Sequence, residues 1–376
     1  ELFGGIGACT KALKNIGLNV NVVDYVEIDK YAVKSYNAIN KTNFEPQDIT
    51  KWSKDINIDL IMHGSPCQDF SIAGKQAGGD EGSGTRSSLM YETIRIIEKL
   101  HPKYIIWENV KNLLSKKHKH NFDNYINKLD KLGYNSYYQI LDAQDYGVPQ
   151  HRERVYTISI RKDIDNKTFE FPKKEELILR LKDMLENEVD EKYYLSAKML
   201  EGFEKHNKKH KEKGTGFIWK PKTEDDIAST LRANGALCPT DNTIKVIGKC
   251  DIKGHDCVKR VYSGEGLAPT LTDMQGGNRQ PKIIEDFYKN RTPREYSEVS
   301  PTLRSERIGL KVKCYEENYR IRKLTPKECW RLMGFDDEDF DKAEKVNSNT
   351  QLYKQAGNSI VVKVLEKIFL NLFKGD

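Results

Sequence analysis

Residues 1–160 alternate short apolar runs with stretches of helical periodicity, and this alternation restricts the possible fold more than any other feature. The apolar runs predict buried strands at 20–28, 58–64, 103–110 and 154–160. Apolar residues at helical spacing predict helices at 8–17, 29–40, 86–100 and 118–132. Strands separated by helices are typical of an α/β fold with a doubly wound, mostly parallel sheet. Ligands of such sheets bind outside the carboxyl ends of the strands.

The chain changes character after Lys162. Residues 163–213 are highly charged and are expected to be helical, whereas 215–318 hold short strand-like pieces broken by Gly, Pro, Asn and Asp. A helix is predicted to start at Thr325 and Pro326, and an amphipathic helix at 359–373 follows the sequence QAGNS. We therefore predict three parts, namely a catalytic and cofactor-binding domain, a smaller mixed domain, and a C-terminal segment returning to the first, at 1–162, 163–345 and 346–376.

Composition excludes two classes of protein. No apolar run approaches the roughly 20 residues of a membrane span, and no secretory signal pattern opens the chain. The seven cysteines are odd in number and scattered, so we expect a reduced, cytoplasmic protein. The formal net charge of +6 permits a polyanionic partner without requiring one. The chain starts without Met inside an apparent strand, so we expect a few residues upstream.

A cysteine stands directly after a proline where the predicted strand 58–64 ends, in the sequence GSPCQDFS. A structural thiol belongs in the core, whereas Cys67 lies at the edge where ligands bind. The glycine-rich stretch 68–88 that follows is predicted to be a lid; a merely disordered loop is the alternative.

Two further polar clusters adjoin strand ends. The sequence WENV places Glu108 and Asn109 at the end of one strand, and QHRER places Arg152 and Arg154 at the start of the last, which could run antiparallel. A carboxylate there is costly to bury unless it is paired. Glu108 therefore either forms a structural ion pair with an arginine or faces a common pocket with Cys67 and the arginines. In the second case we expect the arginines to lower the pKa of the cysteine.

The N-terminal sequence ELFGGIGACTKAL reads as a strand, a glycine turn and a helix. This arrangement aims backbone N–H groups at a ligand, although Thr10 breaks the dinucleotide pattern and a purely structural corner explains the glycines equally well. Glu27, at the end of the second strand, is placed to accept ribose hydroxyls, and Asp48 to accept an adenine amino group. Together these residues indicate an adenosine-containing cofactor.

At this point the sequence resembles the DNA cytosine-5 methyltransferases, of bacterial or phage type, over nearly the whole chain. The motifs that carry the resemblance stand in the family's order: Phe3-x-Gly-x-Gly7, Pro66-Cys67-Gln68, Glu108-Asn109-Val110, Gln150-x-Arg152-x-Arg154, RKLTPKECWRLMGF and QAGNS. The resemblance implies the fold of the S-adenosylmethionine-dependent methyltransferases with a target-recognition domain at 163–345.

The chemistry of the family explains the residue types. Carbon 5 of cytosine is too poor a nucleophile to take a methyl group directly, and addition of a thiolate to carbon 6 makes it enamine-like. The resemblance assigns this attack to Cys67, contact with ring nitrogen 3 to Glu108, and contact with the exocyclic oxygen to Arg154. It implies that Asn109 fixes the catalytic loop, and Arg152 and Gln68 complete the predicted catalytic set. The cytosine must be rotated out of the duplex.

The resemblance implies S-adenosyl-L-methionine as the cofactor. Its predicted site consists of Phe3, Gly5, Gly7, Glu27, Ile28, Asp48, Pro66, Asn358 and Ser359. The family often has a bulky aromatic residue at position 28, where this chain has isoleucine.

Double-stranded DNA is the implied partner, together with a cognate restriction endonuclease in the cell, and the protein is expected to be monomeric. Gln68 and Ser71 are predicted near the space that the cytosine leaves, and the family's Thr-Leu pair has candidates at Thr230, Thr270 and Thr302. Three candidates also allow several recognition elements. The basic run 205–213 is either a phosphate contact or a solvated helix end.

Other interpretations stay open at this stage. A tRNA cytosine-5 methyltransferase shares the fold, but the Cys-Phe-Thr motif of that branch is absent. A catalytically silent DNA-binding regulator does not require the intact Cys67, Glu108 and Arg154. A zinc site formed by Cys238, Cys250, His255 and Cys257 lacks a Cys-x-x-Cys pair, so no metal is predicted.

Overall fold

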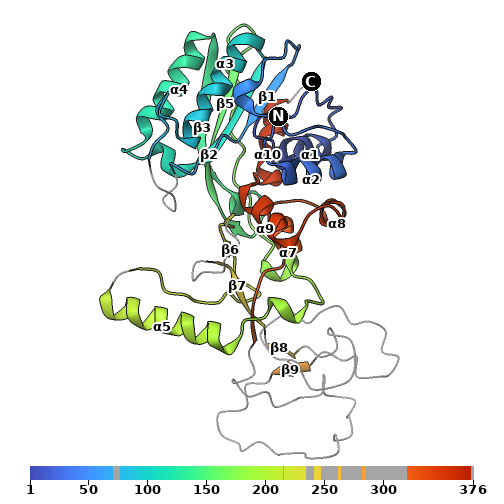
Figure 1. Ribbon diagram of the computed structural model, residues 1–376, viewed down its shortest axis with the longest axis vertical. Coiled ribbons are helices and arrows are strands. Elements are labelled where there is room, and N and C mark those ends of the chain that lie inside the picture. Colours follow the sequence, from blue (N-terminus) through green and yellow to red (C-terminus); the bar gives the residue numbers. More distant parts are fainter. Residues whose placement is uncertain are drawn as a thin grey trace, which may run out of the picture. The chain divides into compact units, whose positions relative to one another are not determined.

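The computed structural model divides the chain into two compact units, each assembled from segments distant in the sequence (Figure 1). The first unit comprises Glu1–Met184, Asp226–Asp241 and Pro326–Asp376, and the second comprises Leu185–Asp225 and Asn242–Thr325. The structure describes residues 1–70, 77–214, 216–233, 241–246, 261–263, 282–284 and 320–373. Parts of the predicted range 163–345 thus fold with the first unit, and the functional boundary of the recognition domain stays a prediction.

The first unit is built on a sheet with the strand order β1-β2-β5-β3. Its strands are β1 (Leu60–His63), β2 (Tyr104–Val110), β3 (Tyr134–Asp142) and β5 (Glu153–Arg161). β1 and β2 are parallel, while β5 is antiparallel to both β2 and β3. The predicted strand 20–28 is reduced to a single bridge between Val26 and Leu2, which also bridges to His63. The α/β class is confirmed, with one antiparallel strand between parallel ones.

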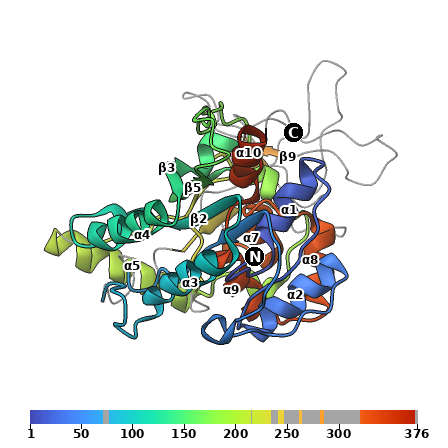
Figure 2. The ribbon, with the colours of Figure 1, turned by 90° about the horizontal axis from the view of Figure 1, so that it is seen from above.

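Helices cover both faces of this sheet, which explains the near-continuous apolar run of β2. Ile105 and Trp107 belong to the cluster formed with α3 (Met90–Leu100) and α4 (Lys119–Lys131). Ile106 points to the opposite face, since side chains alternate along a strand, and it is equally buried. Figure 2 shows α3 and α4 on one side of the sheet and α10 on the other.

The remaining helices of the first unit come from the N-terminal and C-terminal segments of the chain. They are α1 (Ala8–Asn15), α2 (Lys30–Asn40), α7 (Pro326–Arg331), α8 (Asp337–Glu344), α9 (Asn349–Asn358) and α10 (Val362–Leu372). The Asn15 side chain donates to Glu366 at 2.6 Å, which links α1 to α10. The Gln355 side chain donates to the Tyr31 carbonyl at 3.0 Å, which links α9 to α2. The C-terminal segment therefore lies against the N-terminal helices.

Short elements complete the first unit. The 3₁₀ helices are η1 (Ile49–Lys51), η2 (Arg86–Leu89), η3 (Lys111–Leu114), η4 (Ala143–Tyr146) and η5 (Leu181–Met184). Two short parallel strands, β4 (Gln150–His151) and β6 (Ala228–Ser229), pair in register. Their pairing brings residues 226–233 beside the start of β5.

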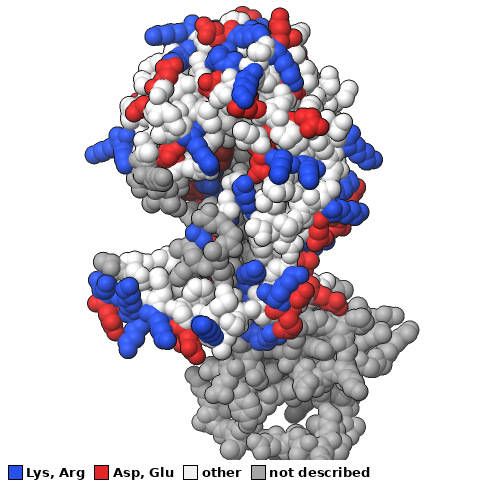
Figure 3. Space-filling model, viewed as in Figure 1, with Lys and Arg blue, Asp and Glu red and all other residues white. Residues whose placement is uncertain are grey.

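In the second unit, α5 (Ala197–Lys213) packs Phe203 against Trp219, with ring centroids 4.8 Å apart. The other elements are η6 (Glu191–Tyr193), β7 (Thr243–Val246), β8 (Val261–Ser263), β9 (Lys282–Ile284) and β10 (Arg320–Lys323). β7 pairs with β10 antiparallel and β8 with β9 parallel. Lysines of the run 205–213 gather at the left end of α5 in Figure 3. Among the described residues no helix is long and apolar enough to cross a membrane.

Candidate active site

The loop that carries Cys67 is fixed at its base by β2. Ser65 is buried directly after β1, and its hydroxyl accepts the indole N–H of Trp107 at 2.9 Å. The side-chain amide of Asn109 donates to the Ser65 carbonyl at 3.3 Å and lies 3.4 Å from the hydroxyl. Buried polar groups that are paired in this way hold a unique geometry. The base of the loop is therefore rigid where the thiol emerges.

Three predicted catalytic groups meet at this edge of the sheet. Glu108 near the end of β2 is 8% exposed, and Arg154 near the start of the neighbouring strand β5 lies across from Val110, two residues further along β2. The two side chains form an ion pair with Glu108 Oε1 3.1 Å from Arg154 Nε. Cys67 is half-buried and forms no disulfide. The charges of Glu108 and Arg154 both act on its thiol. The ion pair and the shared site, posed as alternatives from the sequence, coexist.

The electrostatics of the site differ from the expectation for Cys67. Burial raises the pKa of the thiol, the Glu108 carboxylate raises it further, and the charges of Arg154 and Arg152 lower it by less. The arginines thus lower the pKa of the cysteine as predicted, but burial and Glu108 outweigh them, so the expected net lowering does not occur. Burial also raises the pKa of Glu108, against the opposing charges of the two arginines. Both groups are held nearer to their neutral forms than in water.

Arg152 has a different environment from Arg154, although both belong to QHRER. Its buried guanidinium donates to the carbonyls of Leu231 at 3.2 Å, Gly357 at 3.1 Å and Ser359 at 2.8 Å. A Cβ at Gly357 would lie 2.4 Å from the backbone of Arg232, so the backbones approach too closely for any other residue. Arg152 therefore joins the start of β5, the 231–233 segment and the end of α9.

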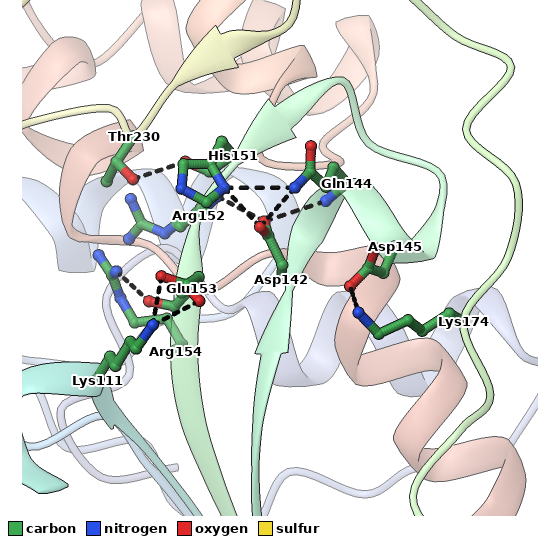
Figure 4. A network of polar contacts seen from close by, with 10 residues as sticks. All are labelled: Lys111, Asp142, Gln144, Asp145, His151, Arg152, Glu153, Arg154, Lys174 and Thr230. Atoms are coloured by element: carbon green, nitrogen blue, oxygen red, sulfur yellow. Dashed lines mark hydrogen bonds and ion pairs between the residues drawn. The ribbon is translucent and has the colours of Figure 1, made fainter.

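Of the three Thr-Leu pairs, the structure describes only Thr230–Leu231, while Thr270 and Thr302 lie outside the described residues. The Thr230 hydroxyl donates to the His151 carbonyl at 2.8 Å, as Figure 4 shows. The Leu231 N–H donates to the Gln150 side chain at 3.3 Å. This pair is fixed to the strand that leads into Arg152 and Arg154.

Side chains along β4 and β5 point in different directions (Figure 4). Glu153 points toward Lys111 and forms an ion pair with it at 2.8 Å. Arg154 donates to the carbonyl of Glu153 at 2.8 Å, which fixes the guanidinium beside Glu108. The alternation of side chains along a strand thus separates the active-site arginine from the surface carboxylate.

Gln68, directly after the cysteine, is exposed, and its side-chain oxygen accepts Arg86 Nη1 at 3.1 Å. The two ends of the glycine-rich loop are joined a second time, since Asp69 N–H donates to the Ser87 hydroxyl and Ser87 N–H to the Asp69 carboxylate, each at 3.1 Å. Ser71 and the rest of 71–76 lie outside the described residues. Whether this loop acts as a lid stays a prediction.

Two tyrosine side chains pack against the glycine turn. Tyr25 and Tyr36 stack with ring centroids 3.8 Å apart, and the Tyr25 hydroxyl donates to the Gly5 carbonyl. A Cβ at Gly7, which has φ +85°, would lie 2.7 Å from the Tyr36 ring. Phe3 and Gly5 both have φ 53°. The aromatic pair therefore explains why the turn needs glycine at position 7.

Glu27 faces this turn. Its carboxylate accepts the N–H of Gly5 at 3.1 Å and of Asp29 at 2.8 Å, and burial raises its pKa. The neighbouring Ile28 is 69% exposed, an unusual state for a large apolar side chain. A Cβ at Gly5 would meet no atom within 4 Å, so the turn is open on that side. The residues present thus fit a ligand with a polar sugar and an apolar ring.

The other predicted cofactor residues have distinct surroundings. The Asp48 carboxylate is exposed and caps η1 by accepting the Thr50 N–H at 3.0 Å. Asn358 ends α9, and Ser359 is the residue whose carbonyl binds Arg152. Pro66 directly precedes Cys67. The zinc candidates lie outside the described residues, and no group of three or more metal-ligating side chains occurs within them.

The sequence analysis did not predict the residues whose hydrogen bonds and packing fix the Cys67 loop and the glycine turn. Ser65 and Trp107 are 42 positions apart in the chain, as are Phe70 and Asn112, whose side chain donates to the Phe70 carbonyl at 2.6 Å. Tyr25 was part of an apolar run with no separate signal. Trp107 could have been found by a search for polar side chains on one strand that can reach the loop after the neighbouring strand.

An open α/β sheet with a thiol, a buried carboxyl and a guanidinium at its strand ends, beside a glycine turn and an acidic residue, is typical of a group-transfer enzyme with a nucleotide-derived cofactor. Comparison with known proteins identifies the family. Residues 1–374 match the family model described as C-5 cytosine-specific DNA methylase. The chain belongs to this family, and it transfers a methyl group from a donor cofactor to carbon 5 of cytosine in DNA.

Individual relatives agree with this assignment. The chain is 36% identical to the orphan methyltransferase M.SPBetaI of Bacillus phage SPbeta, over 99% of this chain and 96% of that protein. It is 30% identical to the type II methyltransferase M.HhaI of Haemophilus parahaemolyticus, over 99% and 93%. The solved structure of the S. pombe Dnmt2 methyltransferase shares the fold, with a TM-score of 0.62 at 17% identity and coverage of 100% and 97%.

Proposed function

We propose that Cys67 is the nucleophile of the cytosine-5 methylation, that Glu108 binds ring nitrogen 3, and that Arg154 binds the exocyclic oxygen. The supporting observation is that Glu108 Oε1 lies 3.1 Å from Arg154 Nε while both charges act on the Cys67 thiol. A nucleophile, a proton donor or acceptor and a fixed cation thus occupy one strand-end site.

The raised pKa of Cys67 indicates how attack is timed. Burial and the Glu108 carboxylate hold the thiol protonated, and burial also raises the pKa of Glu108 itself. When Glu108 takes up a proton from solvent and donates it to nitrogen 3 in a hydrogen bond, its negative charge is lost, and the arginines then favour the thiolate. The thiol proton leaves to solvent, sulfur bonds to carbon 6, and the electron pair of the 5,6 double bond becomes available at carbon 5. After methyl transfer a base removes the carbon-5 proton and the thiolate leaves.

Asn109 and Arg152 are proposed to position these groups. Asn109 holds the base of the Cys67 loop through Ser65. The two terminal nitrogens of Arg152 donate to the carbonyls of Leu231, Gly357 and Ser359. We therefore assign Arg152 to the alignment of β5, and with it of Arg154, rather than to contact with the base.

We infer that the methyl donor is S-adenosyl-L-methionine, which supplies an electrophilic methyl carbon when bound. The turn of Phe3, Gly5 and Gly7 would hold its methionine end, and the Glu27 carboxylate its ribose. Exposed Ile28 offers an apolar surface to the adenine, with Asp48 near its amino group. Pro66, Asn358 and Ser359 complete the proposed site. The exposed apolar residue beside an acid and an open glycine turn supports this assignment.

Trapping tests the nucleophile. With a duplex containing 5-fluorocytosine and the cofactor, the carbon-5 proton is replaced by fluorine, so elimination stops and the Cys67–carbon 6 bond persists. We expect a denaturation-resistant protein–DNA adduct, with peptide mapping to residue 67. The Cys67→Ser variant should give no adduct yet still bind DNA, while the control Cys329→Ala should be trapped like the wild type. An adduct at another residue would disprove the assignment.

Calorimetry tests the cofactor site. Glu27→Ala removes the carboxylate proposed to accept the ribose hydroxyls, and two charge-assisted hydrogen bonds of about 1.5–3 kcal/mol each predict at least tenfold weaker binding of S-adenosyl-L-methionine. The exposed neighbour Glu45→Ala serves as the control. Equal affinity of Glu27→Ala and wild type would contradict this role.

The substrate is proposed to be duplex DNA, with residues of the second unit reading its sequence. Labelled methyl transfer should occur on duplex DNA and not on tRNA. Because relatives are named type II methyltransferases, a restriction-modification role with a cognate endonuclease is proposed, and co-expression tests it. The enzyme is also proposed to be monomeric, which sedimentation tests. Bisulfite mapping of methylated host DNA would give the recognition sequence, and several sequence contexts would support more than one Thr-Leu element.

A further inference from the structure

A basic segment, Lys116–His120, lies between η3 and the first turn of α4, close to the active-site edge. It reads KKHKH, and within it Lys116, Lys117, Lys119 and His120 are exposed whereas His118 is buried. Neither the cofactor site nor the thiol site uses these residues. Only η3 and Ser115 separate the segment from the carboxyl end of β2, the strand that carries Glu108.

The basic segment is attached to the loop of the nucleophile. The ring of His118 packs edge-on against Phe70, with ring centroids 5.4 Å apart at 70°. Asn112, just before the segment, donates to the Phe70 carbonyl at 2.6 Å, and the Phe70 N–H donates to the Cys67 carbonyl at 3.0 Å. One aromatic side chain therefore separates the basic segment from the turn of Cys67.

Two of its charges lack counterions. Lys119 pairs with Asp123 at 2.6 Å, and the nearby Lys111 pairs with Glu153 at 2.8 Å. Lys116 and Lys117 are exposed and make no ion pair with any residue that the structure describes. The charge of Lys117 also contributes to lowering the pKa of His118, after the larger effect of burial. The segment thus concentrates uncompensated positive charge.

The position of this charge opposes the stability of α4. Anionic residues favour the first turn of a helix and cations its last turn, because of the helix dipole. α4 starts with Lys119 directly after Lys116–His118, and its first turn has no acidic residue. Helix stability therefore does not explain these lysines, whereas an external anion does.

We propose that Lys116 and Lys117 bind phosphates of the duplex on the flank of the Cys67 loop and so hold the backbone beside the extruded nucleotide. This inference rests on the proposed function. Phosphate contacts position a protein on DNA but carry no sequence information. The basic segment would accordingly contribute equally to every DNA sequence, in contrast to residues that read the recognition site.

The test compares two double variants by anisotropy on a fluorescent mixed-sequence duplex over a salt series. Lys116→Gln with Lys117→Gln removes the proposed contacts. Lys103→Gln with Lys131→Gln removes the same charge elsewhere, since Lys103 precedes the start of β2 and Lys131 lies at the far end of α4. Each lost phosphate contact makes the negative slope of log K against log salt less steep by about 0.9. For the first variant we expect the magnitude of this slope to decrease by about two such contacts and the Kd to rise about tenfold or more at low salt.

Methyl transfer supplies the second readout. At saturating bacterial genomic DNA, kcat of the Lys116/Lys117 variant should equal that of the wild type while KM for DNA rises, because neither lysine belongs to the proposed thiol site. An unchanged salt slope, or an equal loss in the control variant, would overturn the inference. A wild-type protein that neither binds nor methylates DNA would instead refute the proposed function, so the two failures are distinguishable.

Discussion

The described residues around the nucleophile, 64–70 and 77–89, are held by two unlike sets of contacts. The inner set is buried: Ser65 binds Trp107 and Asn109 of β2, and the hydrogen bond from Trp107 measures 2.9 Å. The outer set is exposed: Asp80 pairs with His120 at 2.8 Å, and Glu81 with Lys128 at 2.7 Å. The side chains of Asp80 and Glu81 are 65% and 61% exposed.

The two sets have different strengths for a physical reason. A buried polar group that loses its partner bears the full cost of its desolvation, about 1–3 kcal/mol. Exposed ion pairs contribute about 0–1 kcal/mol and are screened by salt. The comparison shows that the base of the thiol loop is fixed by the buried inner contacts, whereas the outer contacts are exposed and weak. That the outer part of the loop rearranges around DNA stays a prediction.

Removing the inner contact should have the largest effect. Asn109→Ala deletes the donor to Ser65 and the side-chain oxygen that accepts the Val110 N–H at 2.9 Å. We expect a loss of about 2–3 kcal/mol in the free energy of unfolding. Displacement of the thiol by about 1 Å predicts a kcat lower by on the order of 10²-fold. Urea unfolding and single-turnover methylation measure the two effects.

A control for Asn109 lies on the other side of the same sheet. Asn135 in β3 donates to Asp165 at 2.6 Å, also through its side-chain amide. Asn135→Ala should lower stability by about 1 kcal/mol and leave the rate per folded molecule unchanged. Equal kcat losses in the two variants would show that the Ser65 contact has no special part in placing Cys67.

The buried carboxyl of Glu108 makes the stability of the inner region depend on pH. Its pKa is raised in the folded protein, above all by burial, so the folded state keeps a proton that the unfolded state releases. As the pH rises from the ordinary glutamate pKa to the raised one, the wild type should lose stability relative to Glu108→Gln. Each tenfold difference between the folded and unfolded acid dissociation constants of Glu108 changes the free energy of unfolding by about 1.4 kcal/mol.

Urea unfolding of both proteins between pH 4 and pH 8 tests this prediction. As the pH rises, the free energy of unfolding of the Gln variant should increase relative to that of the wild type. This increase should level off above the raised pKa, because Glu108 is then ionised in both the folded and the unfolded protein. Loss of the ion pair with Arg154 lowers the stability of the Gln variant by an amount that does not depend on the titration of Glu108, so it shifts the curve without changing how the difference varies with pH. Parallel curves would mean that the carboxyl titrates alike in the folded and unfolded states.

Features that depend on neighbouring residues in the chain could be predicted from the sequence. The fold class and the strand-end positions of Cys67 and Glu108 follow from local patterns, since apolar runs and the turn residues after them are contiguous. The strand β3 was missed because only Tyr134 and Leu141 of its residues are buried, so no apolar run marks it. The strand at 20–28 was overpredicted because Leu2 supplies only one bridge to Val26.

The contacts between distant segments were beyond sequence reasoning. The role of Arg152 depends on Leu231, Gly357 and Ser359, which no local pattern brings together. The raised pKa of Cys67 was also missed, because the sequence shows which charges are present but not how much water burial removes. Chemistry-bearing residue types were thus predictable, and their electrostatic state was not.

The smallest effect is expected for the outer contact. Glu81→Gln breaks the ion pair with Lys128, whose amine also lies 5.0 Å from the centre of the Tyr91 ring and so keeps one partner. We expect a change of less than about 0.5 kcal/mol in the free energy of unfolding, vanishing at high salt, with kcat unchanged. Glu92→Gln, which breaks the exposed pair with Arg95 on α3, is the matched control. A kcat change in Glu81→Gln that the control lacks would mean that the outer contacts help to place the thiol, and the distinction between the two sets would then fail.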